Sequence, residues 1–125
     1  MIAIVDDDEA VREATKGFMR SLGYSVETFS SAEDFLQSPH VGRTLCLIAD
    51  VNMPGMSGLD LYLRLAATQR SLPTILITAY PSDNIRAAAL SAGVTCYLVK
   101  PFGDDELMDC IRFALDRPED SGSVA

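Results

Sequence analysis

The sequence lacks a long apolar run, a basic leader and paired cysteines, and each absence narrows the functions to consider. No apolar stretch approaches the ~20 residues that a membrane-spanning helix needs, and strand-like residues begin at Ile2. We therefore expect a cytoplasmic protein that does not bind membranes. The cysteines, Cys46, Cys96 and Cys110, lie in apolar segments without the CxxC spacing of metal or redox sites, which favours free, mostly buried thiols.

Basic residues are also scarce. The chain has 10 Lys and Arg against 18 Asp and Glu, which gives a formal net charge of −8. Because binding to a phosphate backbone depends on clustered Lys and Arg, this excess of acid argues against direct nucleic-acid binding by this domain. The single histidine, His40, follows Pro39 in a polar turn without a second His or Cys nearby, which predicts a solvated loop residue and no metal site there.

The apolar residues that are present form a pattern of short runs. A chain of 125 residues that is 48% hydrophobic fits one domain with a single sizeable core. Continuous runs rich in branched residues are typical of strands buried on both faces, and they occupy residues 2–5, 45–49, 74–78 and 96–99. Residues 25–29 alternate apolar and polar side chains, which predicts a strand at the edge of a sheet.

Helix-like spacing of apolar residues separates these runs. The predicted helices cover residues 10–22, 31–37, 57–68, 83–92 and 104–117. In the third of them we expect Leu59, Leu63 and Ala66 to face the core. Strand and helix thus alternate five times, which predicts an α/β domain over residues 1–117, with a doubly wound parallel sheet and helices on both faces. The polar residues 118–125 are predicted to be a flexible tail or the start of a linker.

Polar side chains stand at the carboxyl ends of the predicted strands, where open parallel sheets bind their ligands. The first strand is followed by Asp6, Asp7 and Asp8, the third by Asp50, and the fifth by Lys100, while the fourth ends at Thr78. Clustered carboxylates attract a hard cation such as Mg²⁺, which favours one or two carboxylates, waters and a phosphoryl oxygen. A lysine and a hydroxyl can hold the other phosphoryl oxygens.

The four consecutive acids from Asp6 to Glu9 raise the question of how their repulsion is offset. Two like charges ~4 Å apart cost on the order of 1 kcal/mol in water and roughly 4 kcal/mol at an effective dielectric of 20. Asp8 and Glu9 suit the cap and first turn of the helix that follows. We then expect Asp6 and Asp7 to be the metal-binding half of a site that Asp50 would complete.

Four motifs together resemble the receiver domain of two-component response regulators. They are VDDDEAVR, IADVNMPGMSGLDL, ITAY and YLVKPF, and the match in order and spacing extends to about Arg117. MPGMSGLDL with KPF also resembles regulators of the nitrogen-fixation type. The resemblance implies a flavodoxin-like (βα)5 fold with strand order 2-1-3-4-5.

The resemblance also implies a signalling role rather than an enzyme with an external substrate. Asp50 would accept a phosphoryl group from the phosphohistidine of a sensor histidine kinase, and the domain would promote its own phosphorylation and dephosphorylation. Mg²⁺ would bind directly to Asp7, Asp50 and the backbone carbonyl of Asn52, and through a water to Asp6. Positioning and electrostatics would supply the catalysis.

Further residues receive roles by the same resemblance. Lys100 and Thr78 would contact the phosphoryl group, Thr78 would move toward it, and Tyr97 would follow into the space released. Asn52 and Tyr80 would border the attacking water and tune dephosphorylation; we hypothesise that bulky Tyr80 slows hydrolysis by excluding water.

The resemblance further points to an output surface. It is made by the fourth helix, fifth strand and fifth helix, so residues 85–92 and 104–113 are candidates for a phosphorylation-dependent homodimer. The peptide bond between Lys100 and Pro101 is expected to be cis.

Two other classes of protein stay open. An aspartyl-nucleophile phosphatase of the haloacid dehalogenase type also places an acid after its first strand, and Asp6 to Asp8 contains a DxD. The chain length, Ala10 in place of the usual Thr or Val, and the full motif set argue against it. A pseudo-receiver that works without phosphorylation would lack an acid or the lysine, and both are present. The sequence leaves open whether a DNA-binding output domain follows residue 125.

Overall fold

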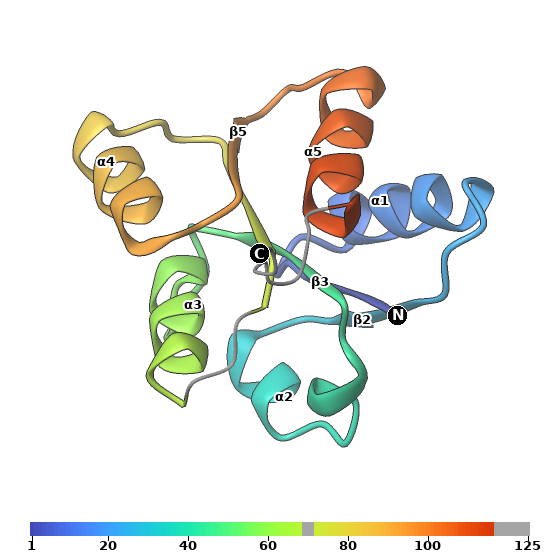
Figure 1. The fold of residues 1–125 in the computed structure, drawn as a ribbon, viewed down its shortest axis with the longest axis horizontal. Coiled ribbons are helices and arrows are strands. Elements are labelled where there is room, and N and C mark those ends of the chain that lie inside the picture. Colours follow the sequence, from blue (N-terminus) through green and yellow to red (C-terminus); the bar gives the residue numbers. More distant parts are fainter. Residues whose placement is uncertain (69–71, 117–125) are drawn as a thin grey trace, which may run out of the picture.

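The computed structural model describes residues 1–68 and 72–116, and its core is a five-stranded parallel sheet (Figure 1). The strands are β1 (Ile2–Val5), β2 (Val26–Phe29), β3 (Cys46–Asp50), β4 (Thr74–Thr78) and β5 (Cys96–Val99). Their order in the sheet is β2-β1-β3-β4-β5. This order confirms the flavodoxin-like doubly wound fold that the sequence predicts.

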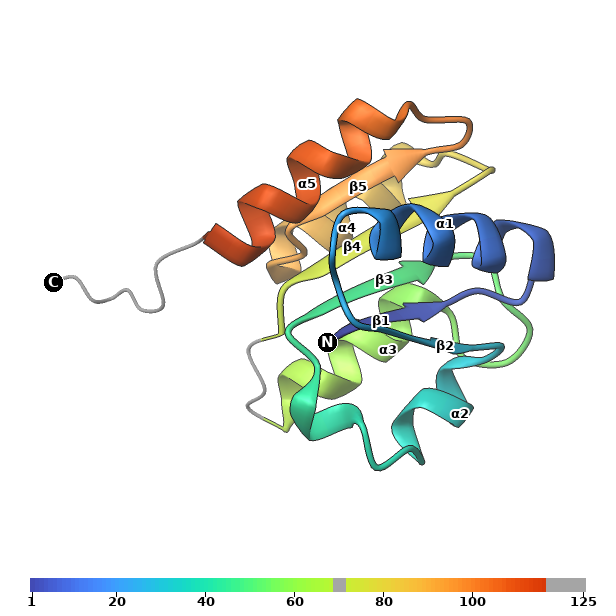
Figure 2. The same cartoon turned by 90° about the vertical axis from the view of Figure 1, so that its right-hand side faces the viewer.

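Four helices connect the strands, a fifth follows β5, and together they cover both faces of the sheet (Figures 1 and 2). They are α1 (Glu9–Ser21), α2 (Ala32–Leu36), α3 (Gly58–Ala67), α4 (Asp83–Ala92) and α5 (Asp104–Asp116), and a short 3₁₀ turn that the sequence did not indicate, η1 (Val41–Arg43), precedes β3. α1 and α5 lie on one face of the sheet, and α2, α3 and α4 lie on the other.

Among the described residues, no helix is long and apolar enough to cross a membrane. The predicted tail, residues 118–125, and Arg117 lie outside the described residues.

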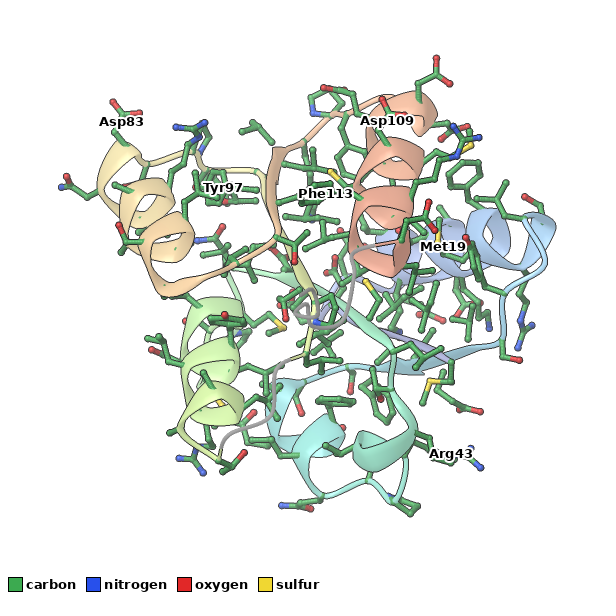
Figure 3. All side chains as sticks on the ribbon, in the orientation of Figure 1. Met19, Arg43, Asp83, Tyr97, Asp109 and Phe113 are labelled. Carbon is green, nitrogen blue, oxygen red and sulfur yellow. The ribbon has the colours of Figure 1, made fainter. Side chains whose placement is uncertain are left out.

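The two-sided covering explains why the central strands are apolar throughout. Successive side chains of a strand point to opposite faces, so Ile48 and Ile75 pack under α1 and α5, whereas Leu47 and Leu76 pack against α2, α3 and α4. Figure 3 shows Met19 on the side of α1 that faces this packing, and it is fully buried. The two apolar clusters share the sheet between them and hold the strand ends in a fixed register.

The prediction for β5 was wrong in one respect. Its apolar run predicted a strand buried on both faces, but β5 is an edge of the sheet, its residues are only half-buried, and Val99 is 41% exposed. Apolar composition does not show how far neighbouring elements extend over a strand. β2, predicted as an edge strand, forms the opposite edge.

The predicted inner face of α3 was wrong for Leu63 and Ala66, which are exposed, whereas Leu59 packs against the core as predicted. Leu61 and Leu65 are buried, whereas Leu63 is 45% exposed. Leucines at every second position allow two different apolar stripes on this helix, so spacing alone could not choose between them. The choice is made at its start, where Gly58 lies so close to β3 that an added Cβ would sit 2.5 Å from the carbonyl oxygen of Asp50. This contact sets the rotation of the helix.

Short polar side chains begin most of the helices. Asp8 caps α1 by accepting hydrogen bonds from the backbone N–H groups of Ala10 (3.0 Å) and Val11 (3.3 Å). Serines at positions 31, 57 and 82 cap α2, α3 and α4 in the same way. Side-chain acceptors of this kind satisfy backbone donors that a helix start leaves without partners. Asp8 therefore has the capping role that the sequence predicts.

Candidate functional site

Three carboxylates converge at the carboxyl edge of the sheet. β1 and β3 pair with Val5 opposite Ala49, so the residues that follow, Asp6 and Asp50, emerge at the same edge. One oxygen from each of Asp6, Asp7 and Asp50 lies within 4.8 Å of the others. Asp6 and Asp50 are buried, with 3% and 6% of their surface exposed, and Asp7 is exposed. The structure thus brings together the acids that the sequence predicts as a cluster.

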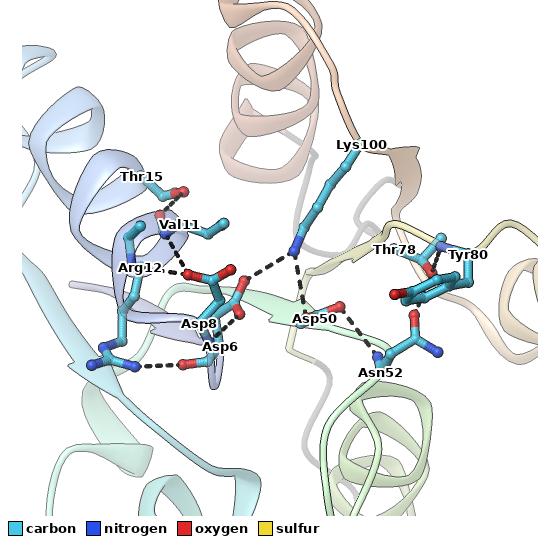
Figure 4. Close-up of polar contacts among 11 residues, drawn as sticks. Asp6, Asp8, Val11, Arg12, Thr15, Asp50, Asn52, Thr78, Tyr80 and Lys100 are labelled. Carbon is cyan, nitrogen blue, oxygen red and sulfur yellow. Dashed lines mark hydrogen bonds and ion pairs between the residues drawn. The ribbon is translucent and has the colours of Figure 1, made fainter.

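Lys100 reaches into this cluster from the end of β5 (Figure 4). Its Nζ lies 3.5 Å from Oδ2 of Asp6 and 3.5 Å from Oδ2 of Asp50. The backbone N–H of Lys100 donates to the carbonyl of Thr78 (2.8 Å), and the Lys100–Pro101 peptide bond is cis. One ammonium group therefore bridges the two buried carboxylates.

Burial and like charge act together on Asp6. Loss of solvent is the largest effect and raises the pKa of the Asp6 carboxyl group, and the neighbouring charges of Asp50 and Asp7 raise it further. A hydrogen bond from the backbone N–H of Asp8 (2.9 Å) and the charge of Lys100 act in the opposite direction but do not cancel the shift. The pocket thus holds more negative charge than its own lysine offsets.

A second polar chain lies on the other side of Asp50. The hydroxyl of Thr78, fully buried at the end of β4, donates to Oδ1 of Asn52 and accepts from the backbone N–H of Tyr80 (2.9 Å). The backbone N–H of Asn52 donates to Oδ1 of Asp50 (3.2 Å). The Tyr80 side chain is 73% exposed at the rim. The structure therefore brings together Thr78, Asn52 and Tyr80, three of the four residues for which the resemblance implies phosphoryl contact or tuning.

Tyr97 lies farther from the carboxylates, between β5 and α4 (Figure 3). Its ring is half-buried against the apolar cluster under α2, α3 and α4. Its hydroxyl accepts a hydrogen bond from the backbone N–H of Ser82 (3.5 Å), the residue that caps α4. Tyr97 therefore connects β5 to the start of α4 and does not contact the carboxylate cluster.

Three residues support the site in ways that sequence reasoning missed. Arg12 of α1 donates from Nη1 to the backbone carbonyl of Asp6 (2.8 Å) and so fixes the end of β1. Glu33 of α2 accepts a hydrogen bond from the backbone N–H of Met56 (3.1 Å), and this bond fixes the position of the loop after Asp50. Gly58 permits the close packing of α3 described above. Arg12 and Gly58 lie inside the quoted motifs, but Glu33 carries no signal in the sequence.

A comparison with protein families agrees with this geometry. The model of the response regulator receiver domain matches residues 2–112. The chain belongs to this family. The response regulator TodT of Pseudomonas putida F1 is 43% identical over 115 residues, which cover 92% of this chain and 51% of TodT. Nodulation protein W of Bradyrhizobium diazoefficiens is 37% identical, over 94% of this chain and 52% of that protein.

Solved structures show the same fold. The response regulator StyR superposes with a TM-score of 0.85 at 38% identity, covering 92% of this chain and 58% of that one. FixJ-N gives a TM-score of 0.82 at 31% identity and covers 92% of both chains. These matches confirm the receiver family to which the motifs pointed. The chain spans about half the length of the curated relatives that it matches.

The raised pKa of Asp6 predicts how metal-free stability depends on pH. A carboxyl group with a higher pKa in the folded state binds its proton more tightly when folded, so its contribution favours folding at low pH. That contribution is lost as pH rises from the ordinary pKa of aspartate through the raised one. We expect the free energy of unfolding, measured with urea and a chelator, to fall with pH over this window in wild type relative to Asp6→Asn. Parallel curves for the two proteins would contradict the assignment.

Proposed function

We propose that this receiver accepts a phosphoryl group on Asp50 from the phosphohistidine of a sensor histidine kinase, in the cytoplasm and with Mg²⁺ bound. The observation that carries the proposal is the convergence of three carboxylate oxygens within 4.8 Å beside the ammonium group of Lys100. Positive charge next to an acidic pocket suits a reaction in which a phosphoryl group approaches a carboxylate.

The donor set fits a magnesium ion. Mg²⁺ prefers oxygen ligands and uses one or two carboxylates together with waters and phosphate oxygens. Asp7 and Asp50, with the backbone carbonyl of Asn52, would bind it directly, and Asp6 would hold it through a water. When bound, the ion supplies positive charge that offsets the carboxylates and the phosphoryl oxygens. Three ionised carboxylates against one ammonium group leave a formal charge of −2 in the pocket (−3 + 1), which the divalent ion would match.

The chain's own residues would position and stabilise the transfer. An oxygen of Asp50 attacks the phosphorus atom, the bond to the histidine nitrogen breaks, and the nitrogen keeps the electron pair. Lys100 lies 3.5 Å from Asp50 and can neutralise charge on a phosphoryl oxygen there. The product is an acyl phosphate on Asp50, which water later hydrolyses.

The same reaction would change the output surface. Thr78 would turn its hydroxyl from Asn52 to the phosphoryl group, and Tyr97 would move into the space released. The surface formed by α4, β5 and α5 carries partly exposed apolar side chains, at Leu90, Val99 and Phe113. We propose that these support a phosphorylation-dependent homodimer. The longer relatives have residues that the alignments do not cover, and we propose no direct nucleic-acid contact for this chain.

Phosphorylation by acetyl phosphate tests the acceptor. Trypsin separates Asp6, in residues 1–12, from Asp50, in residues 44–64. We expect one phosphoryl group per chain, dependent on Mg²⁺ and located by mass spectrometry in residues 44–64. Asp50→Asn should abolish it, because an amide is not a nucleophile here, whereas Asp60→Asn in the same peptide should retain it.

The other possible outcomes of this labelling experiment would indicate different classes of protein. Phosphate on residues 1–12 would indicate the aspartyl-nucleophile phosphatase. No phosphorylation of a folded wild-type protein, by acetyl phosphate or by kinases, would indicate a pseudo-receiver.

If the carboxylate pocket binds Mg²⁺, the melting temperature of the protein should rise when Mg²⁺ is added. A ligand that binds only the folded state stabilises it by about 2.7 kcal/mol at 100 times its dissociation constant. We expect added Mg²⁺ to raise the melting temperature of wild type and not that of Asp7→Ala. Asp8→Ala is the matched control, because it should lower basal stability by about 1 kcal/mol through loss of the α1 cap and still respond to Mg²⁺. A wild-type melting temperature independent of Mg²⁺ would contradict the metal site.

Tyr80 should affect the lifetime of the phosphoryl group on Asp50. Its exposed ring stands two residues beyond Thr78, and we propose that it limits the approach of water to the acyl phosphate. Tyr80→Ala should shorten the phosphoryl half-life measured after removal of the donor, whereas Tyr80→Phe, which keeps the ring, should preserve it. An unchanged half-life in Tyr80→Ala would refute this role.

A further inference from the structure

A group of thiols lies on the sheet face opposite α2, α3 and α4, away from the carboxylate cluster. Cys96 begins β5 and is paired with Ile75, so its side chain shares the face covered by α1 and α5. Cys110 lies on the buried side of α5 and packs into the same apolar cluster. Cys46 of β3 is fully buried in that cluster. All three thiols are free.

Ideal strand and helix dimensions also place Cys96 and Cys110 at similar distances from the β5–α5 connection. β5 and α5 run in opposite directions (Figure 2). Cys96 lies three residues before the end of β5, ~10 Å along a strand, and Cys110 lies six residues after the start of α5, ~9 Å along a helix. Both side chains pack at the same apolar cluster, and the neighbouring Cys96 thiol contributes to the raised pKa of the Cys110 thiol. The strand register and the shared apolar cluster therefore place the two thiols on the same side of the sheet, between β5 and α5.

We propose that Cys96 and Cys110 are a modification site, at which a low-molecular-weight disulfide such as oxidised glutathione converts the two thiols into a reversible intramolecular disulfide. Cys96, deprotonated, attacks one sulfur of oxidised glutathione, and one glutathione leaves as a thiolate that takes up a proton. Cys110 then loses its proton to solvent and attacks the Cys96 sulfur, and the second glutathione leaves with the electron pair. Two protein thiols are oxidised, and one glutathione disulfide is reduced to two thiols.

The different surroundings of the thiols set the order of these steps. Cys96 is only half-buried on an edge strand, so it is accessible to the oxidant first. Burial is the main cause that raises the pKa of Cys110 to about 12, so its thiolate is scarce at neutral pH. Burial likewise raises the pKa of Cys46 to about 12, and Cys46 lies on a central strand without the exposure of Cys96. Cys96 is therefore the attacking thiol and Cys110 the resolving thiol.

The disulfide would join β5 to α5, two of the three elements of the proposed output surface. The bond itself does not depend on phosphorylation, so its formation and the labelling of Asp50 are separate measurements. Closing a loop of about 14 residues between the two cysteines restricts the unfolded chain, and the oxidised protein should melt at a higher temperature.

Peptide mapping of the folded wild-type protein tests the proposal without any mutation. Because trypsin does not cut before Pro101, Cys96 and Cys110 fall in one peptide, residues 87–112, and Cys46 falls in residues 44–64. After incubation with oxidised glutathione, we expect residues 87–112 to lose the mass of two hydrogen atoms and to resist alkylation, while Cys46 is alkylated completely after unfolding. Dithiothreitol should reverse the change. The rate of ring closure should rise about tenfold per pH unit between pH 7 and 9, in proportion to the thiolate of Cys110.

Matched variants identify the order of the steps. Cys110→Ser should accumulate glutathione on Cys96, Cys96→Ser should stay unmodified, and Cys46→Ser should form the disulfide at the wild-type rate. Circular dichroism verifies that each variant is folded. A stable glutathione adduct on wild type, a disulfide between two chains, involvement of Cys46, or reaction only in urea would each overturn the proposal.

Discussion

The repulsion among Asp6, Asp7 and Asp50 is the constraint on which the rest of the site depends. The register of β1 and β3 brings their carboxylates to one edge, and burial of Asp6 and Asp50 removes the water that would screen them. The domain offsets part of this cost with local donors. Lys100 bridges both buried carboxylates, and the backbone N–H groups of Asp8 and Asn52 each donate to one. The remaining negative charge is what suits the pocket to a divalent cation.

The convergence of these residues could be predicted because it follows from topology more than from detail. Carboxyl ends of parallel strands meet at one edge whatever the exact bounds of each strand, so a polar residue after each apolar run was enough to place Asp6, Asp50 and Lys100 together. The alternation of strands and helices predicted the sheet for the same reason. The order of the strands in the sheet could not be predicted in this way, because no local sequence pattern encodes it. That prediction came from the resemblance to receiver domains.

The parts that were not predicted depend on contacts between different elements of the fold. α3 has two candidate apolar stripes, and the contact of Gly58 with the Asp50 carbonyl decides between them. Glu33 supports the loop after Asp50 from a position 23 residues earlier than its partner Met56, and Arg12 reaches back to the Asp6 carbonyl. Periodicity and local capping rules contain no information about such pairs, because Glu33 and Arg12 in the sequence alone look like ordinary charged surface residues.

The hydroxyl of Thr78 shows how a change at Asp50 would reach a distant surface. A hydroxyl has one proton to donate, and in this structure Thr78 donates it to Asn52. Contact with a phosphoryl group on Asp50 would therefore break that bond and displace the hydroxyl that accepts from Tyr80. Tyr80 lies two residues before Ser82, which caps α4 and donates to the hydroxyl of Tyr97. Loss of one hydrogen bond at the end of β4 would thus alter the start of α4 and the packing of Tyr97 together, and under this proposal a few polar contacts would join the site to the proposed output surface.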